Sequence, residues 1–569
     1  MGTPQEIPKN LFCLAPGEPT SSCLPWQKEN FAMRRFRVLL FLLLVTALVG
    51  GALIGGLIGG ETAVAAPRTT PVTTITVNSG TDPDTSDSRT CITYTPCTLR
   101  RAVIQARNLP ANEKPVLIAF DIPATAGEGY DSTLNIWKIQ FSGISSAANA
   151  TLRYLNGSII IDGSTQPGGR SAGPKIILVG PGTGQWDGLK LGETAVQNAN
   201  EIRGLGFQMF KTHIYVNSNS NLIDGNWFGL SDDGTDIVLR GGGEDDGSGN
   251  TGVSVAANTT GNAVQNNVFT GLAGVAAAMN GDDGVFANNY VGTTAVGTVP
   301  AKLTDPSLIC SQWDWLGGSG ISVSGDGNTI ENNVFAGLRI AVEPPTIQAD
   351  TIRLAGDHHV VQNNKIGLDA GNAEIGVCGR GIYLLGGTEY NQVIANRIIR
   401  PELSAISLND TPVVSTSDAN TLRGNVIKKL TPWGEIEGNN SPEDAIQMTK
   451  SLPDAFRNFQ PAQVTSIEGT AVSGSSGAGS PCPNCVVELF LDDTDGITET
   501  LQSLAVVTAN NSGNWTAVLP AALTTGQALR TTSTTTLPNT IPGMSAGTTT
   551  GLSALYTPSV RVYLPLIKH

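Results

Sequence analysis

The sequence predicts an all-β chain built around a right-handed, single-stranded parallel β-helix. Three observations lead to this fold class: an asparagine-centred motif that recurs through the middle of the chain, short apolar alternations that precede it, and a composition of 569 residues with 67 glycines and only 14% charged residues. Glycine supplies the tight turns that many short strands need. The low charge argues against a disordered polyelectrolyte.

The recurring motif has the form Asn-x-apolar-x-x-Asn, as in residues 221–226 and 328–333. The shortest interval between copies is 22 residues, which matches the roughly 20–25 residues that three short strands and their turns require. Two intervals are near twice that length, and the others fit one coil with an insertion.

In such a coil the same asparagine stacks on its copies, and its amide donates to one neighbour and accepts from the other. Asparagine also tolerates the left-handed backbone of a sharp turn. The predicted column consists of Asn226, Asn267, Asn289, Asn333, Asn364, Asn396 and Asn425.

Short segments with alternating apolar residues precede the motif and predict one further strand per coil, as in Gly252–Val255 and Gly320–Val323. Alternation with a period of two places the apolar members in the lumen. A helical solenoid would need long stretches of 3.6-residue apolar periodicity, which the sequence lacks. The outward row is predicted to contain Lys190, Tyr215, Ser254, Ser322, Tyr383 and Ser407. Tyr215 and Tyr383 are candidates for stacking on sugar rings, although single exposed tyrosines are common on surfaces.

Residues 33–66 have the features of an export signal. Arg34 and Arg35 begin it, residues 38–58 are apolar or glycine, and Ala63 and Ala65 form a small-x-small cleavage pattern. The apolar stretch is also long enough to remain as a single membrane anchor. Residues 1–32 then form a leader or a mis-assigned start. In both cases the rest of the chain is expected outside the cytoplasm, secreted or at the cell surface.

The cysteines of the exported part fall into three pairs that are close in sequence or could meet in the coil. In an exported chain such pairs predict disulfides. The alternative for the last pair is a redox or half-zinc CxxC, which is disfavoured because no second CxxC and no histidine cluster accompany it. The pairs are Cys91 with Cys97, Cys310 with Cys378, and Cys482 with Cys485.

The segment Cys97-Thr-Leu-Arg-Arg-Ala102 resembles the CSLREA motif of exported bacterial β-helix proteins, which usually carry Glu where Arg101 stands. Val116–Phe120 is similar to the first core strand of that family, and Ile161–Gly168 is similar to a turn that its members share. The resemblance implies a short capping helix near 97–108, with residues 67–150 forming the cap and first strands and 151–460 the β-helix. A cap is needed because an open coil exposes its core and its strand edge.

After residue 460 the asparagine repeat stops. Residues 464–557 resemble the small immunoglobulin-like modules of bacterial surface proteins, with a strand at Val486–Leu491 and a later one at Gly513–Leu519, and predict a β-sandwich. The turn between them carries Asp492, Asp493 and Asp495, which are either Ca²⁺ ligands or ordinary exposed turn carboxylates. The tail 558–569 is either a sorting tag or a final edge strand.

Candidates for catalysis exist on the predicted coils. A polysaccharide lyase needs carboxylates for Ca²⁺ and a Lys or Arg base, and a hydrolase needs two carboxylates. Each candidate also has a structural interpretation as a turn former or a solvated coil edge, and Lys365 and Arg397 are expected to be near neighbours in the stack. His359 replaces an asparagine of the motif and is interpreted as its substitute. The candidates are Asp282, Asp283, Asp357, His358, Lys365 and Arg397.

The formal net charge of −14 disfavours nucleic acid and anionic lipid as partners. The sequence therefore predicts an exported adhesin, glycan-binding protein or structural envelope component, with a polysaccharide or a cell-surface protein as partner. The alternative is a polysaccharide lyase or glycoside hydrolase. No cofactor is expected, except that Ca²⁺ is an option at the acidic turn.

Overall fold

The computed structural model describes residues 70–83, 88–141, 151–182, 186–193, 199–238, 250–272, 274–301, 319–338, 350–408, 419–429, 445–448, 459–477, 481–540 and 544–558. The chain divides into two units, Met1–Thr62 and Ala63–His569. The first unit, the predicted signal at 33–66 and the tail from residue 559 lie outside the described residues. Within the described part of the chain, no helix is long and apolar enough to span a membrane. The export signal and the anchor at 38–58 therefore stay predictions.

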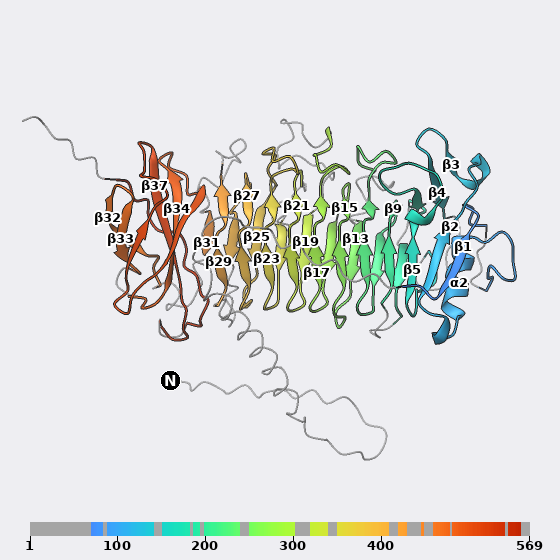
Figure 1. The fold of residues 1–569 in the computed structure, drawn as a ribbon, viewed down its shortest axis with the longest axis horizontal. Helices are drawn as coiled ribbons and strands as arrows, with labels where there is room; N and C mark the ends of the chain where they lie inside the picture. The colour runs from blue at the N-terminus through green and yellow to red at the C-terminus, as the bar shows by residue number, and fades with distance from the viewer. Residues whose placement is uncertain are drawn as a thin grey trace, which may run out of the picture. The chain divides into compact units, whose positions relative to one another are not determined.

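Three long sheets, in which the coils pair in parallel, form a right-handed β-helix (Figure 1), as predicted. Sheet A contains β1 (Thr73–Val77), β2 (Val116–Phe120), β5 (Ile159–Asp162), β8 (Glu201–Arg203), β11 (Leu222–Asp224), β14 (Ala263–Gln265), β17 (Val285–Ala287), β20 (Thr329–Glu331), β23 (Val360–Gln362), β26 (Gln392–Ile394) and β29 (Thr421–Arg423). Sheet B contains β3 (Tyr130–Asp131), β4 (Ile136–Gln140), β6 (Ile176–Val179), β9 (Leu205–Gln208), β12 (Trp227–Phe228), β15 (Val268–Phe269), β18 (Tyr290–Val291), β21 (Val334–Phe335), β24 (Lys365–Ile366), β27 (Arg397–Ile399) and β30 (Val426–Lys428). Sheet C contains β7 (Asp187–Leu191), β10 (Thr212–Val216), β13 (Thr251–Val255), β16 (Val275–Met279), β19 (Ser319–Val323), β22 (Asp350–Leu354), β25 (Arg380–Leu384), β28 (Ile406–Leu408) and β31 (Ile446–Met448). The pair β3 and β4 is antiparallel.

Each coil runs through sheet C, then A, then B, and each interval between motif copies is one coil. The expectation that two intervals span nearly two coils was wrong. β11 pairs directly with β14 across an interval of 41 residues, and β17 pairs directly with β20 across 44. The added length lies in insertions between sheets, because surface loops lengthen at little cost in free energy.

The lumen is filled by the inward apolar side chains of the strands, with one from each short strand of sheets A and B and two from most strands of sheet C. Ile223, Val264 and Phe286 are fully buried at equivalent positions of sheet A. In sheet B the rings of Phe207, Phe228 and Phe269 stack on successive coils with centroid distances of 5.1 and 4.7 Å. A parallel stack at the coil spacing of about 4.8 Å keeps each ring in contact with the next.

The N-terminal cap is the helix α2 (Leu99–Asn108), which confirms the predicted capping helix. Thr98 accepts a hydrogen bond from the Arg101 amide at the start of the helix, as N-cap residues do. The buried Arg100 donates to both carboxylate oxygens of Asp82, at 2.8 and 2.7 Å, and to the carbonyl of Thr151. Short 3-10 helices follow at η1 (Ala111–Glu113), η2 (Ala126–Glu128) and η3 (Gly163–Thr165).

The C-terminal part is a small sandwich of two three-stranded antiparallel sheets, as predicted. Val487, Leu489 and Trp515 are buried between the sheets. The immunoglobulin-like assignment stays a prediction. One sheet contains β32 (Gln463–Glu468), β33 (Ala471–Ser475) and β36 (Asn514–Val518), and the other β34 (Val486–Asp493), β35 (Gln502–Thr508) and β37 (Gln527–Thr534).

The sandwich bonds to the last coil of the β-helix. The Ile427 amide donates to the carbonyl and to the hydroxyl of Thr500, and the Leu422 amide donates to the hydroxyl of Thr549 at 3.0 Å. The Gly424 amide donates to the buried carboxylate of Glu488. These contacts satisfy backbone groups of β29 and β30 that no further coil pairs.

Candidate functional site

The predicted asparagines stack in one column at the corner between sheets A and B. In each pair the side-chain amide of one asparagine donates to the side-chain oxygen of the next, as from Asn226 to Asn267 at 3.1 Å and from Asn333 to Asn364 at 2.9 Å. The same oxygen accepts the backbone amide of the asparagine before it. The remaining contacts join Asn267 to Asn289, Asn289 to Asn333, Asn364 to Asn396, and Asn396 to Asn425.

The expectation that the column asparagine itself adopts the left-handed backbone was wrong. The residue before it has positive φ in every coil, for example Asn266 at 56° and Asn363 at 55°. The column asparagine is held by its side chain instead. Two different demands, a left-handed turn and an amide ladder, therefore account for the frequent Asn-Asn pairs.

A second column stands at the corner between sheets C and A and contains the first asparagine of the motif. Asn221 donates to Asn262 at 2.8 Å, and Asn391 donates to Asn420 at 3.0 Å. His359 replaces one member: its Nδ1 accepts the Asn328 amide at 3.1 Å, and its own amide donates to Asn391 at 2.8 Å.

Four of the catalytic candidates lie beside this second column. Asp283 and His358 occupy its left-handed position, with φ of 51° and 62°. The carboxylate of Asp282 accepts the Asp326 amide at 2.9 Å, and that of Asp357 accepts the Glu389 amide at 2.7 Å. These carboxylates therefore tie one coil to the next. The exposed His358 ring stacks on Tyr390 of the following coil at 5.1 Å.

Lys365 and Arg397 lie on a different face. They are register partners on β24 and β27 of sheet B, outside the corner that carries Asp282 and His358. The structure therefore does not bring the six candidates together into one acid–base set.

The outward row of sheet C contains the predicted residues and three more, Ala278, Arg353 and Gln447. Lys190 lies between the rings of Tyr154 and Tyr215, at 5.7 and 5.5 Å, and is paired with Asp187 at 3.1 Å. The half-buried Tyr215 thus already holds a cation.

Tyr383 is not the open stacking platform that was predicted. It is only 7% exposed, and the Arg380 guanidinium lies 3.5 Å from its ring centroid. Arg380 also pairs with Asp350 at 2.8 Å. Burial raises the pKa of Asp350, and the positive charge of Arg380 opposes that shift. Next to this buried set, Arg353 is exposed.

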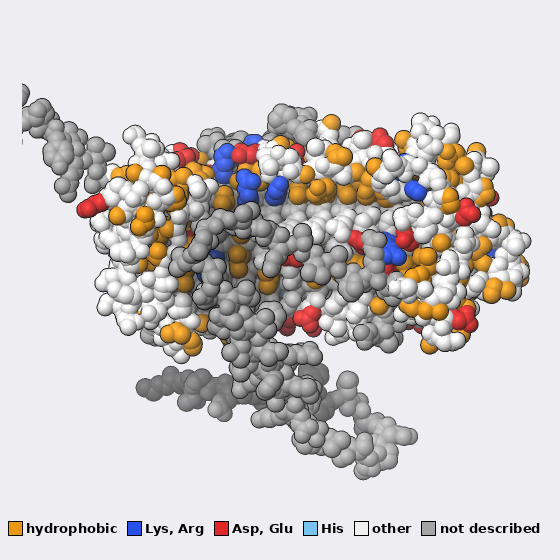
Figure 2. Space-filling model, in the orientation of Figure 1, with side chains coloured by type: hydrophobic (Ala, Val, Ile, Leu, Met, Phe, Trp, Pro, Cys, Tyr) orange, Lys and Arg blue, Asp and Glu red, His pale blue; other side chains and the backbone are white. Residues whose placement is uncertain are grey.

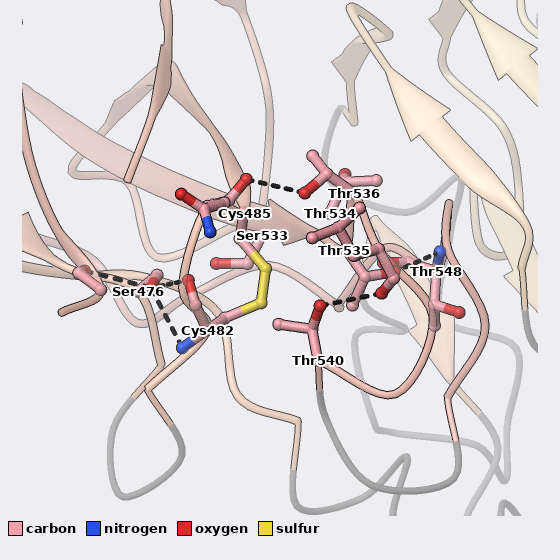
Figure 3. Close-up of a disulfide and its surroundings, with 12 residues drawn as sticks. Ser476, Cys482, Cys485, Ser533, Thr534, Thr535, Thr536, Thr540 and Thr548 are labelled. Carbon is pink, nitrogen blue, oxygen red and sulfur yellow. Dashed lines mark hydrogen bonds between the residues drawn. A yellow bond between two sulfur atoms is a disulfide. The ribbon is translucent and has the colours of Figure 1, made fainter. Parts of the chain in front are cut away.

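Two disulfides are formed within the described residues, Cys91–Cys97 beside the N-terminal cap and Cys482–Cys485 in the sandwich. Figure 3 shows the second beside the threonine-rich segment Thr534–Thr536, with Thr536 donating to the Asn484 carbonyl. Both of its cysteines are fully buried, which favours a structural bond over a redox site. Cys378 is disulfide-bonded, and Cys310 lies outside the described residues.

Within the described part of the chain, one acidic cluster could hold a hard cation: Asp492, Asp493 and Glu499. Asp495, predicted with the first two, is not part of it, and Glu499 takes its place. Arg530 already pairs with Asp492. Burial together with the three neighbouring aspartates raises the pKa of Glu499 to about 7. A guanidinium and a partly protonated acid thus already reduce the charge that would attract Ca²⁺.

Sequence reasoning missed Lys428, Arg353 and Glu499. Lys428 follows Asn425 by three residues, so the register of the asparagine motif places it on sheet B near Arg397. Arg353 was missed because its strand has Thr351 at the second position, where most other strands of sheet C have Gly or Ala.

A comparison with known protein families finds no match, and no curated protein is similar to the chain. Among solved structures, the A-module of the mannuronan C-5 epimerase AlgE4 of Azotobacter vinelandii matches with 10% identity and a TM-score of 0.32, covering 62% of this chain and 93% of that one. The Dettilon tailspike protein matches with 11% identity and a TM-score of 0.36, over 84% and 93% of the two chains. DFA-IIIase from Arthrobacter chlorophenolicus matches with 12% identity and a TM-score of 0.28, over 56% and 84%. At these scores neither a residue role nor an activity carries over to this chain.

Proposed function

We propose that the protein is an exported, non-catalytic β-helix that binds glycans at the cell surface or in the envelope. The observation that carries this proposal is the distribution of the ionisable groups. The carboxylates of the C–A corner accept backbone amides, and those of sheet C pair with Lys190 and Arg380. General acid–base chemistry needs a base within reach of a substrate proton, and groups already committed to the fold are poor candidates.

Export is supported by the disulfides. Cys91–Cys97 holds the segment before the capping helix, and Cys482–Cys485 lies inside the sandwich. Bonds of this kind form in oxidising compartments and are rare in the cytosol. They agree with the signal predicted at 33–66.

The test uses the purified full-length chain in a mild detergent, incubated with a panel of neutral and acidic polysaccharides with and without Ca²⁺. Binding is measured by interferometry, and turnover by reducing ends and by the ultraviolet absorbance of unsaturated products. We expect binding without turnover. New reducing ends or unsaturated products contradict the proposal, as does a panel in which nothing binds.

A polysaccharide lyase or glycoside hydrolase is the second candidate, and one observation favours it. Asp350, Arg380 and Tyr383 lie together on neighbouring coils, with the exposed Arg353 beside them. If turnover is found, Asp350→Asn and Arg353→Gln should abolish it, whereas Asp282→Asn at the C–A corner should not.

Calcium at Asp492, Asp493 and Glu499 stays a hypothesis. An ion that binds only the folded chain raises its melting temperature by mass action. A rise on adding millimolar CaCl₂ that is absent in Glu499→Gln would support it, and equal melting curves for wild type with CaCl₂ and with chelator would reject it.

A further inference from the structure

The outward row of sheet B changes character along the β-helix. Its register partners run Trp227, Val268, Tyr290, Val334, Lys365 and Arg397 on successive coils. Apolar and aromatic side chains therefore give way to two cations on adjacent coils. The row then continues with Val426 on β30, and a third cation, Lys428, stands two residues further along that strand, in register with Ile399.

A ridge of hairpins covers the apolar part of this row. The segments 229–238, 292–299 and 367–376 each fold back after a strand of sheet B, and they bond to one another from Ala295 to Gly234 and from Ala370 to Gly297, both at 3.0 Å. The first lies against Trp227 and the second against Tyr290. The third reaches Lys365, whose Nζ donates to the Ala370 carbonyl at 3.3 Å.

The ridge of hairpins does not continue past β27, the strand that carries Arg397. β27 is followed by Arg400 and Pro401 and not by another hairpin, and Arg397 is exposed. Within the described residues, the only hydrogen bond of its side chain is a long contact of 3.5 Å to Asn372. Neither Lys365 nor Arg397 has a carboxylate partner in the described part of the chain. Glu374, in the third hairpin, is engaged by Lys428 at 2.8 Å.

Figure 2 shows Lys and Arg side chains gathered around this end of sheet B, beside a band of hydrophobic side chains. Such a patch is unexpected on a chain with a net charge of −14. Two like charges one coil spacing apart, about 4.8 Å, repel each other unless an anion lies between or over them.

We propose that this face binds a linear polysaccharide that carries carboxylates, lying along the β-helix axis over β24, β27 and β30. This inference rests on the proposed glycan-binding function and names its ligand class. The guanidinium of Arg397 can bind a carboxylate with two parallel hydrogen bonds, and Lys365 acts as a point charge beside it. Lys428, which is paired with Glu374, borders the site. The coil spacing is of the order of one sugar residue, so an extended chain would present successive acidic groups to Lys365 and Arg397.

The negative net charge of the protein favours a polyuronate over polyanions of higher charge density. A nucleic acid or a heavily sulfated chain carries more charge over a larger area than three cations can match, and the surrounding acidic surface repels it. A polyuronate needs only one cation for each sugar.

The experiment compares polygalacturonate with its fully methyl-esterified form, which has the same backbone without charge, and with dextran and dextran sulfate. Binding of the full-length chain is measured by interferometry at low and physiological salt. We expect polygalacturonate to bind and the methyl ester to bind far more weakly, with affinity falling as salt rises. The double variant Lys365→Gln/Arg397→Gln should lose about tenfold or more in affinity, because charged hydrogen bonds are removed.

The matched control is Arg89→Gln, which removes an exposed arginine from the segment before the capping helix and should leave the affinity for polygalacturonate unchanged. The single variant Arg397→Gln keeps the test valid if the double variant does not fold. Equal binding by wild type and Arg397→Gln would overturn the assignment of this face. Equal binding of the ester, or preference for dextran sulfate, would overturn the carboxylate while leaving glycan binding intact. Failure of every polysaccharide to bind would reject the proposed function itself.

Discussion

At the scale of single residues, two positions per corner decide how the chain turns. One residue has positive φ and the next contributes the ladder amide. Four coils place asparagine at the first of these positions before the sheet A–B column, and two place glycine there. Ala395 is the exception, with φ of 54°. An L-residue other than Asn, Asp or Gly is strained there by roughly 1–2 kcal/mol.

We predict that Ala395→Asn stabilises the protein. The exposed side chain has room, and asparagine relieves backbone strain at this φ, so the gain in free energy of unfolding should be about 0.5–1 kcal/mol. Differential scanning calorimetry at one scan rate measures the shift in melting temperature. The opposite change in the coil before, Asn363→Ala, should lower it, and a fall with Ala395→Asn would contradict the argument.

His359 makes the second column sensitive to pH. Its Nδ1 accepts the Asn328 amide and its Nε2–H donates to the Ala355 carbonyl at 3.3 Å. Protonation of Nδ1 would point its N–H at the Asn328 N–H, and this hydrogen bond would be lost. The side chain is fully buried, and burial lowers its pKa from the ordinary 6.5. The bond to the Ala355 carbonyl and the charges of Asp326 and Asp357 oppose this shift, and His358 adds slightly to it.

The sign of the pH effect follows from linkage. Below pH 6.5 the unfolded chain takes up a proton that the folded chain still refuses, so stability falls with pH until the folded chain protonates as well. His359→Asn restores the usual column residue. We expect the stability of this variant to fall less than that of the wild type as the pH is lowered from neutral to below 6.5. Melting temperatures over that range measure it. His358→Asn removes only the smallest of the contributions that shift the His359 pKa, so it should keep most of the wild-type slope. Parallel slopes for wild type and His359→Asn would show that His359 is not the source.

At the scale of elements, the sandwich serves as the C-terminal cap of the β-helix. Thr500, Thr549 and Glu488 satisfy backbone amides of β29 and β30. Helix α2 does the equivalent work at the other end, where Arg100 and Asp82 form a buried, doubly bonded pair. An exposed sheet edge recruits further strands, so both caps keep the coils from pairing with other chains.

The cap can be tested at one hydroxyl. Thr549→Val keeps the shape of the side chain but leaves the Leu422 amide and the buried Thr534 hydroxyl without this partner, at a cost of about 1–3 kcal/mol. Thermal unfolding should therefore begin at lower temperature. Thr516→Val, on the exposed face of β36, should change stability by less than about 0.5 kcal/mol. Similar effects of the two substitutions would mean that the hydroxyl of Thr549 does not support the last coil.

At the scale of the whole molecule, closure at both ends makes the β-helix a finite stack. The asparagine columns and the three sheets continue from coil to coil without an internal stop signal. Stacking of that kind is open-ended, since each coil offers the next the same hydrogen-bonding edge.

A chain that ends before residue 459 should therefore self-associate. Without the sandwich, the edges of β29 and β30 lose Thr500, Thr549 and Glu488. We expect larger species by light scattering, with increased β-structure in the assembled fraction. Thr549→Val in the full-length chain is the control that weakens the cap without exposing the edge, and it should remain unassociated. A truncated chain that stays monomeric would show that sandwich and β-helix are independent modules.

The amino-acid sequence alone determined the coil architecture, the asparagine column, the N-terminal capping helix and the sandwich that follows the coils. The reason is local: one motif per turn carries its turn residue, its ladder amide and its lumen side chain within six residues. Only the tertiary structure decided which side chains of different coils become neighbours. Insertions of unequal length hide that relation, so the pairing of Arg380 with Asp350, the burial of Tyr383 and the hairpin ridge beside Lys365 appear only after the coils are stacked. The same stacking replaced Asp495 with Glu499 in the acidic cluster, because packing against the last coil buries Glu499, whereas Asp495 remains in an exposed turn.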